Sequence, residues 1–215
     1  MMQIRAERLA YWYLRLNGFL TTENFVVHPD SGSNQETDVD VMGIRFPYRQ
    51  ENLVDPMQDD TTLNYPDNKI LIILGEVKLG ECALNGPWTN RSRNNMYRVL
   101  MAIGAIKKDE AITVAEELYT KGYYKNDEYE IGLLLFGKHK NIDINERLPH
   151  IRQVTWNQIL TFIFHRFKKY RRTKGSHGQW DSDVKQLWVV YNGPINSDKK
   201  MGYPKKSDSH HEKAT

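Results

Sequence analysis

The sequence predicts an α/β fold in which a mixed sheet is flanked by helices. Three observations predict it: an amphipathic helical pattern opens the chain, three strand-like segments follow, and two helical patterns separate these from a further strand. Three consecutive strands favour an antiparallel meander. A helical crossover then returns the chain to the sheet as a parallel strand.

The first helix is expected over residues 3–17. Seven apolar residues fill one arc of a helical wheel drawn at roughly 100° per residue. They are Ala6, Leu9, Ala10, Trp12, Tyr13, Leu14 and Leu16. Asn17 and Gly18 both tolerate the left-handed conformation that ends helices, so the helix is expected to end there.

Strands are expected over residues 19–28, 37–46 and 70–77, of which the last is a compact apolar run. Residues 47–69 hold three prolines and four aspartates and read as a long excursion from the sheet. We expect this excursion to be an insertion and a candidate substrate-side loop.

The rest of the chain alternates between helical and strand patterns. Helices are expected over 93–107, 109–121, 156–172 and 180–191, and strands over 129–138 and 150–155. One domain is therefore predicted over residues 1–192. Residues 193–215 lose most apolar side chains and are expected to form a disordered basic and polar tail.

Composition sets limits on the setting of the protein. The formal net charge of +3 is compatible with nucleic-acid binding but does not argue for it. The single cysteine, Cys82, cannot form an internal disulfide, which favours a reducing environment. No apolar run approaches the roughly 20 residues that cross a bilayer. We expect a soluble, cytoplasmic protein without a membrane partner.

Two aspartates lie in the second predicted strand. Residues two apart in a strand share a face. Asp38 and Asp40 are therefore expected to point the same way. Val39 and Val41 are expected to point into the opposite layer.

An acid and a lysine end the third predicted strand. Glu76 and Lys78 share a face there, with Val77 between them on the other side. A carboxylate in a strand buried on both faces is costly unless it is paired or binds a metal. Clustered carboxylates without histidine or cysteine suit Mg²⁺ or Mn²⁺. The alternative is that these residues are edge-strand charges that face solvent.

Glu7 lies within the apolar arc of the first helix. This position is explained if the helix packs against the acidic end of the sheet. The alternative is an ordinary surface glutamate.

The order of these residues resembles the PD-(D/E)XK nuclease superfamily. The resemblance is carried by Glu7, by Thr37-Asp38-Val39-Asp40-Val41 and by Ile72-Ile73-Leu74-Gly75-Glu76-Val77-Lys78. It covers roughly residues 3–138. It implies a restriction-endonuclease-like αβββαβ core, to which this chain adds C-terminal helices.

The resemblance also implies roles for individual residues. Asp40 and Glu76 would be metal ligands, Lys78 would be catalytic, Glu7 would support the metal and the Val77 carbonyl would complete the site. The second motif lacks the family's proline, so Asp38 and Asp40 compete for the ligand position. We favour Asp40, because the residue two before the ligand is often acidic in such proteins.

The function implied is metal-dependent phosphodiester hydrolysis, with DNA favoured over RNA as the substrate. The resemblance also suggests a role in defence against foreign nucleic acid, controlled by a protein partner or by homo-oligomerisation. A different hypothesis is a nucleic-acid-binding or assembly subunit with little or no turnover. A sugar- or nucleotide-processing enzyme ranks low, because neither a glycine-rich phosphate loop nor a nucleophile elbow is found.

Basic residues supply candidate phosphate contacts. A run without an acid ends the long helix predicted over 156–172 and consists of Arg166, Lys168, Lys169, Arg171, Arg172 and Lys174. Cations also favour a helix C-terminus through the helix dipole, so this run has a structural alternative. Arg91 and Arg93 follow the third strand and are candidates for substrate contact near the metal; a simple capping loop is the alternative.

Overall fold

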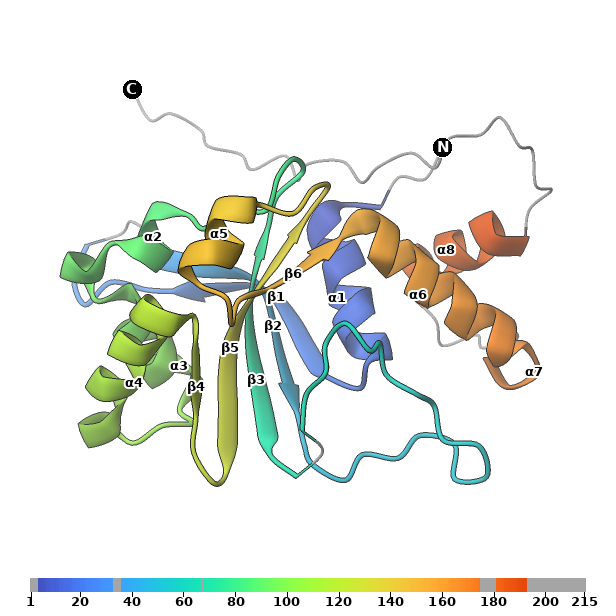
Figure 1. Ribbon diagram of the computed structural model, residues 1–215, viewed down its shortest axis with the longest axis horizontal. Helices are drawn as coiled ribbons and strands as arrows, with labels where there is room; N and C mark the ends of the chain where they lie inside the picture. The colour runs from blue at the N-terminus through green and yellow to red at the C-terminus, as the bar shows by residue number, and fades with distance from the viewer. Residues whose placement is uncertain (1–3, 33–35, 67, 175–180, 193–215) are drawn as a thin grey trace.

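The computed structural model describes residues 4–32, 36–66, 68–174 and 181–192 (Figure 1). Six strands in this part of the chain form one open, mixed sheet in the order β1-β2-β3-β5-β4, and β6 also pairs with β5. The strands are β1 (Leu20–Val27), β2 (Thr37–Arg45), β3 (Ile70–Val77), β4 (Tyr123–Lys125), β5 (Tyr129–Gly137) and β6 (Arg152–Thr155). The predicted α/β class is confirmed.

Helices connect and flank these strands. They are α1 (Ala6–Leu16), α2 (Gly86–Thr89), the 3₁₀ turn η1 (Arg91–Arg93), α3 (Asn95–Ile103), α4 (Lys108–Lys121), α5 (Ile142–Arg147), α6 (Trp156–Lys169), α7 (Arg171–Lys174) and α8 (Ser182–Asn192). Within the described residues, none of these helices is long and apolar enough to cross a membrane. The tail predicted over 193–215 lies outside the described residues.

The strand connections follow the expected order. β1, β2 and β3 form an antiparallel meander. The chain then crosses through α3 and α4 and returns as β5, parallel to β3, and a second crossover through α5 gives the parallel strand β6. The sequence patterns missed β4, α5, α2 and η1, because three to six residues are too few to display a period.

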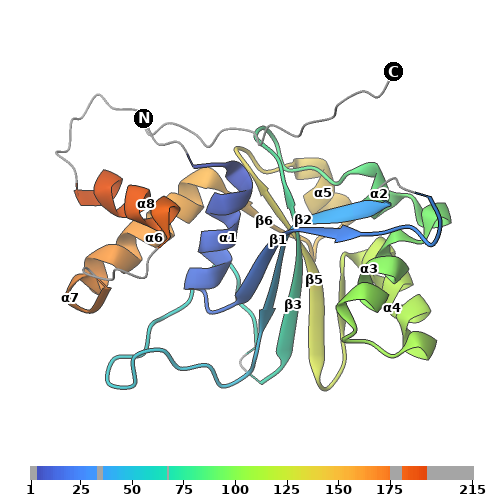
Figure 2. The ribbon, with the colours of Figure 1, turned by 180° about the vertical axis from the view of Figure 1, so that it is seen from behind.

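Two hydrophobic clusters lie on opposite faces of the sheet (Figures 1 and 2). One joins α1, α6 and α8 to the strands, and the other joins α3 and α4 to them. β3 divides its side chains between the two: Leu71 and Ile73 belong to the first cluster, Ile72 and Leu74 to the second. This alternation is the period of two expected for a strand that is buried on both faces.

β2 breaks this alternation at Asp40. Val41 belongs to the cluster with α1, whereas Val39 belongs to the cluster with α3 and α4. On the neighbouring strand, Asn24 faces this position in the register and has a positive φ of 51°. The prediction that Val39 and Val41 point into one layer is therefore wrong, because the strand turns over between them.

The excursion over residues 46–69 leaves the sheet at the end remote from Asp40. Arg45 pairs with Leu71, whereas Val41 pairs with Gly75, so five residues of β2, or about 16 Å of strand, separate Asp40 from the start of the excursion. The excursion therefore does not lie beside Asp40 and Glu76. The excursion packs instead against α1 and α6.

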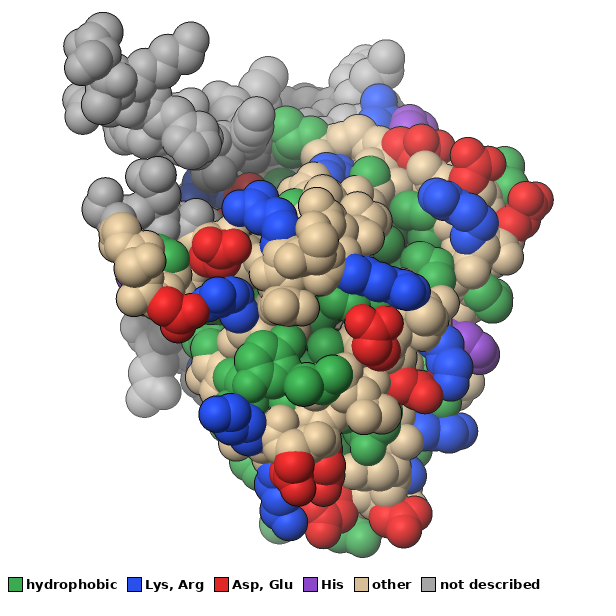
Figure 3. Space-filling model, turned by 90° about the vertical axis from the view of Figure 1, so that its left-hand side faces the viewer, with side chains coloured by type: hydrophobic (Ala, Val, Ile, Leu, Met, Phe, Trp, Pro, Cys, Tyr) green, Lys and Arg blue, Asp and Glu red, His purple; other side chains and the backbone are tan. Residues whose placement is uncertain are grey.

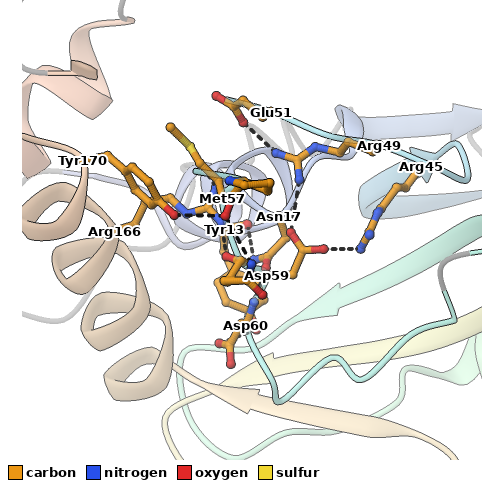
Figure 4. A network of polar contacts seen from close by, with 12 residues as sticks. Tyr13, Asn17, Arg45, Arg49, Glu51, Met57, Asp59, Asp60, Arg166 and Tyr170 are labelled. Carbon is orange, nitrogen blue, oxygen red and sulfur yellow. Dashed lines mark hydrogen bonds and ion pairs between the residues drawn. The ribbon is translucent and has the colours of Figure 1, made fainter. Parts of the chain in front are cut away.

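A polar network holds the excursion in place (Figure 4). Asp60 accepts a hydrogen bond from the hydroxyl of Tyr13 at 2.8 Å, and its backbone N–H donates to the side-chain oxygen of Asn17 at 2.7 Å. Asp59 pairs with Arg45 and Arg49. Asn17 thus has two roles, because it also caps α1, which ends as predicted before Gly18 with its φ of 84°.

Candidate active site

Asp40 connects β2 to β3 through its side chain. Backbone pairing between the two strands ends at Val41 and Gly75. One residue further, Oδ2 of Asp40 accepts a hydrogen bond from the backbone N–H of Val77 at 2.7 Å. The carboxylate therefore reaches the end of β3, where the backbones no longer pair. Asp38 instead pairs in register with Val26 of β1.

Glu76 is buried at the end of β3, with 3% of its surface exposed. One carboxylate oxygen, Oε1, pairs with the ammonium group of Lys78. The other, Oε2, accepts a hydrogen bond from the indole Nε1 of Trp88 at 2.6 Å. Glu76, Lys78 and Asp40 thus come together where β2 and β3 stop pairing, and Lys78 keeps part of its side chain in solvent.

The two carboxyl groups have raised pKa values. Burial raises the pKa of Glu76 to about 7, and the nearby Asp40 carboxylate acts in the same direction, whereas Lys78 and Trp88 oppose both. Burial also raises the pKa of Asp40, against the hydrogen bond from Val77. One ammonium group is therefore too little positive charge for this pair.

Glu7 lies in the first turn of α1 and is half-buried. Its negative charge raises the pKa of Asp40, as does that of Asp38. Among the described residues, no three Asp, Glu, His or Cys side chains are arranged so that they could hold a metal ion. Asp40 and Glu76 are the two carboxyl groups that come together here, and Glu7 acts on Asp40 through its charge.

Trp88 is the site residue whose role the sequence did not indicate. Its indole is buried, packs in the cluster with α3 and α4, and holds Glu76. The only local signal is a tryptophan in the short helix α2 after the third strand, and this does not identify Glu76 as its partner.

Arg91 and Arg93 follow Trp88 by three and five residues and form η1. Both side chains are about half exposed. Arg91 lies 3.6 Å from Glu116, and Arg93 lies 3.7 Å from Glu36. Exposed pairs at such distances are weak. Both guanidinium groups therefore remain accessible to a ligand that approaches α2.

The basic run lies at the far end of α6 (Figure 1). α6 follows β6, whose last residue, Thr155, pairs with Gly137 of β5, next to the level of Val77. The helix then extends for 14 residues, or ~21 Å, before Lys169. The basic run therefore lies at the opposite end of α6 from Glu76.

The run itself is divided in two. Lys168, Lys169, Arg171 and Arg172 are exposed, and the side chain of Lys174 lies outside the described part of the chain. Arg166 is buried; its guanidinium donates to the carbonyl oxygen of Gln58. The prediction that Arg166 contacts phosphate is therefore wrong, because the helical period turns it toward the excursion.

Charges of both signs are interspersed on the side of the molecule that carries α3 and α4 (Figure 3). On α4, Lys108 is followed directly by Asp109 and Glu110, and Lys121 pairs with Glu117 at 2.8 Å. Such a surface has no field of one sign to attract a polyanion.

No protein-family model matches the chain, and the searches of curated proteins and of solved structures gave no match.

Proposed function

We propose that this protein is a metal-dependent nuclease with a restriction-endonuclease-like αβββαβ core. The observation that carries the proposal is the meeting of Asp40 and Glu76 where β2 and β3 stop pairing, beside Lys78. Both carboxyl groups are desolvated, and the charge of Asp40 further raises the cost of ionising Glu76. Structural ion pairs do not require two carboxylates to be buried side by side.

A divalent cation fits this donor set. Asp40 and Glu76 would hold it with the backbone carbonyl of Val77, and Glu7 would support it through its charge. Carboxylate and carbonyl oxygens without nitrogen or sulfur ligands favour Mg²⁺ or Mn²⁺. When bound, such an ion lowers the pKa of water and neutralises charge that develops on a phosphodiester.

The protein's own side chains would have separate tasks. Lys78 places a positive charge beside Glu76, where it can orient a water molecule or stabilise the phosphorane. Trp88 holds one oxygen of Glu76 and thereby sets the direction of the other. Arg91 and Arg93 would contact substrate phosphates on the side of α2.

The substrate proposed is nucleic acid, with DNA favoured over RNA. The resemblance of the motifs supports this choice, together with a role in defence and with control by a partner protein or by homo-oligomerisation.

The test is a cleavage assay on supercoiled plasmid, linear duplex and single strands of DNA and RNA. Reactions contain Mg²⁺, Mn²⁺ or EDTA. Glu76→Ala and Asp40→Asn are compared with the wild type. Glu117→Gln is the matched control, because it removes a carboxylate from the exposed surface of α4.

Cutting that needs the metal and is lost in Glu76→Ala and Asp40→Asn, but not in Glu117→Gln, supports the nuclease. Calorimetry should show Mg²⁺ or Mn²⁺ binding that the same two variants lose. Nucleic-acid binding with neither metal binding nor cutting would instead favour the binding or assembly subunit.

A further inference from the structure

The excursion and the end of α6 line an open surface pocket. Its volume is about 350 Å³, and it is lined by Asn52, Asp55, Lys168, Lys169, Tyr170, Arg171 and Arg172. We call these seven residues the distal basic site. Four of them carry positive charge and one carries negative charge.

The cations of this site are poorly compensated. Lys169 lies 3.9 Å from Asp55, the limit of an ion pair. Within the described part of the chain, Lys168, Arg171 and Arg172 have no acidic partner at salt-bridge distance. The helix dipole explains why cations lie in the last turn of α6. It does not explain why residues 52 and 55 of the excursion form the other side of the pocket.

Hydrogen bonds attach the excursion's side of the pocket to the end of α6. Residues 51–57 form a closed turn, since the N–H of Met57 donates to the carbonyl oxygen of Glu51 at 3.0 Å. Below the turn, the hydroxyl of Tyr170 donates to the carbonyl oxygen of Pro56 at 3.3 Å. Buried Arg166 donates to the carbonyl oxygen of Gln58, so α6 holds the turn from beneath (Figure 4).

Two apolar side chains stand at the tip of this turn. Leu53 is 78% exposed and Val54 is 96% exposed. With Phe46 and Tyr48, the excursion carries four of the ten large exposed hydrophobic residues in the described chain. Leu53 and Val54 are neighbours, and contiguous exposed apolar surface is a feature of interaction sites.

We infer that the distal basic site and the tip formed by Leu53 and Val54 are a second nucleic-acid contact, remote from Asp40 and Glu76. The four cations would bind the phosphate backbone, and the tip would pack against sugars or a base step, as apolar wedges do in other proteins. This inference rests on the proposed function, because the same polymer would reach both sites. α6 spans ~21 Å, or about six base pairs, between the end of β6 and these cations.

Charge and shape favour nucleic acid as the occupant. Cations lining a pocket suit discrete phosphate groups, and two apolar residues on a turn present the small area of a wedge. Stable membrane binding by a lone turn needs a larger apolar face or a second anchor.

The experiment measures binding of the full-length protein to a fluorescent duplex of about two helical turns (~20 bp) in EDTA, over a range of salt concentrations. Lys168→Ala/Arg172→Ala should weaken binding at least tenfold and should reduce the slope of log K against log salt by about two, close to one per lost phosphate contact. Lys107→Ala/Lys108→Ala is the control, because it removes two exposed cations near the acids of α4.

Substitutions at the tip should affect the salt dependence of binding differently from substitutions of the cations. Leu53→Ser/Val54→Ser should weaken binding several-fold without changing the salt slope, because no ionic contact is removed. Wild-type binding by both double variants, or equal losses in the Lys107/Lys108 control, would overturn the inference. So would the absence of duplex binding by the wild type.

Sedimentation with phospholipid vesicles tests whether this surface binds a membrane instead. If the tip variant loses sedimentation with anionic phospholipid vesicles but keeps duplex binding, the surface is a membrane contact and the inference is wrong. Since the binding assay needs no turnover, its outcome is separate from that of the proposed nuclease. Loss of duplex binding in the variants of a protein that cuts nothing would support the distal basic site and refute the nuclease, and the reverse pattern would do the opposite.

Discussion

The indole Nε1 of Trp88 donates a hydrogen bond to Oε2 of Glu76 across 2.6 Å, inside the protein. Trp88 lies on α2, which follows β3 in the chain, and Glu76 lies at the end of β3. A helix beyond the strand therefore determines how the strand presents its carboxylate. Hydrogen bonds of this kind commonly orient groups that bind metals.

Trp88→Phe removes this hydrogen bond and keeps an aromatic ring. We expect metal binding to weaken about 10- to 100-fold, because Glu76 loses the contact that orients it. Calorimetric titration with Mn²⁺ measures the change. Trp12→Phe is the control, since it removes an indole N–H from α1 instead; an equal loss of affinity in that variant would contradict the role given to Trp88.

Glu76 makes stability depend on pH in the metal-free protein. Its folded pKa of about 7 lies above the ordinary 4.5, so the folded chain binds this proton more tightly than the unfolded chain does. The free energy of unfolding should therefore fall as pH rises from 4.5 to 7, by at most about 3 kcal/mol for this group. Well above pH 7, Glu76 is ionised in both the folded and the unfolded chain, and its contribution to the free energy of unfolding no longer changes with pH.

Glu76→Gln cannot ionise and should lack this pH dependence. In EDTA, urea unfolding should show a stability gain of the variant over the wild type that is larger at pH 8 than at pH 4.5. Mg²⁺ should then stabilise the wild type and not the variant. A gain of equal size at both pH values would contradict the assignment of the raised pKa to Glu76.

Gly75 lets β2 and β3 approach one another next to Asp40. A Cβ atom at this position would lie 2.8 Å from the backbone oxygen of Val41 and 2.6 Å from its Cγ1. Because backbone cannot move aside cheaply, Gly75→Ala should destabilise the fold by roughly 1–3 kcal/mol. Gly132→Ala on β5 is the control, since a Cβ there meets no atom within 4 Å. Equal urea midpoints for the two variants would disprove the close approach.

Arg166 connects α6 to the excursion from a buried position. Arg166→Ala removes its hydrogen bond to Gln58 and its packing on the ring of Phe162, and should cost roughly 2–3 kcal/mol. The excursion should then be cut faster by proteases, as limited proteolysis with mass spectrometry would show. Lys168 is an exposed cation two residues away, and Lys168→Ala should leave the rate of proteolysis of the excursion unchanged.

The order of the large elements and the main site residues could be read from the chain. Burial on both faces makes β3 a continuous apolar run, and the acids at its end and in β2 stand out because carboxylates are costly in such strands. The interruption of the side-chain alternation in β2 at Asp40 could not be predicted from the sequence. A strict period of two predicts one face for Val39 and Val41, and the fold overrides it where the two strands stop pairing.

The α/β class and the meander followed by a crossover could be predicted from the amino-acid pattern, because hydrophobic period and the succession of helices and strands are local properties of a chain. The choice of Asp40 rather than Asp38 as the partner of Glu76 and Lys78 came from the resemblance of the motifs. Three features became visible only in the folded chain: Trp88 holds Glu76, Arg166 is buried, and the excursion meets the exposed cations of α6 far from the carboxylates. These contacts join residues between 12 and 114 positions apart. Spacing in the sequence carries no information about them, since strand register and helix packing set which distant groups meet.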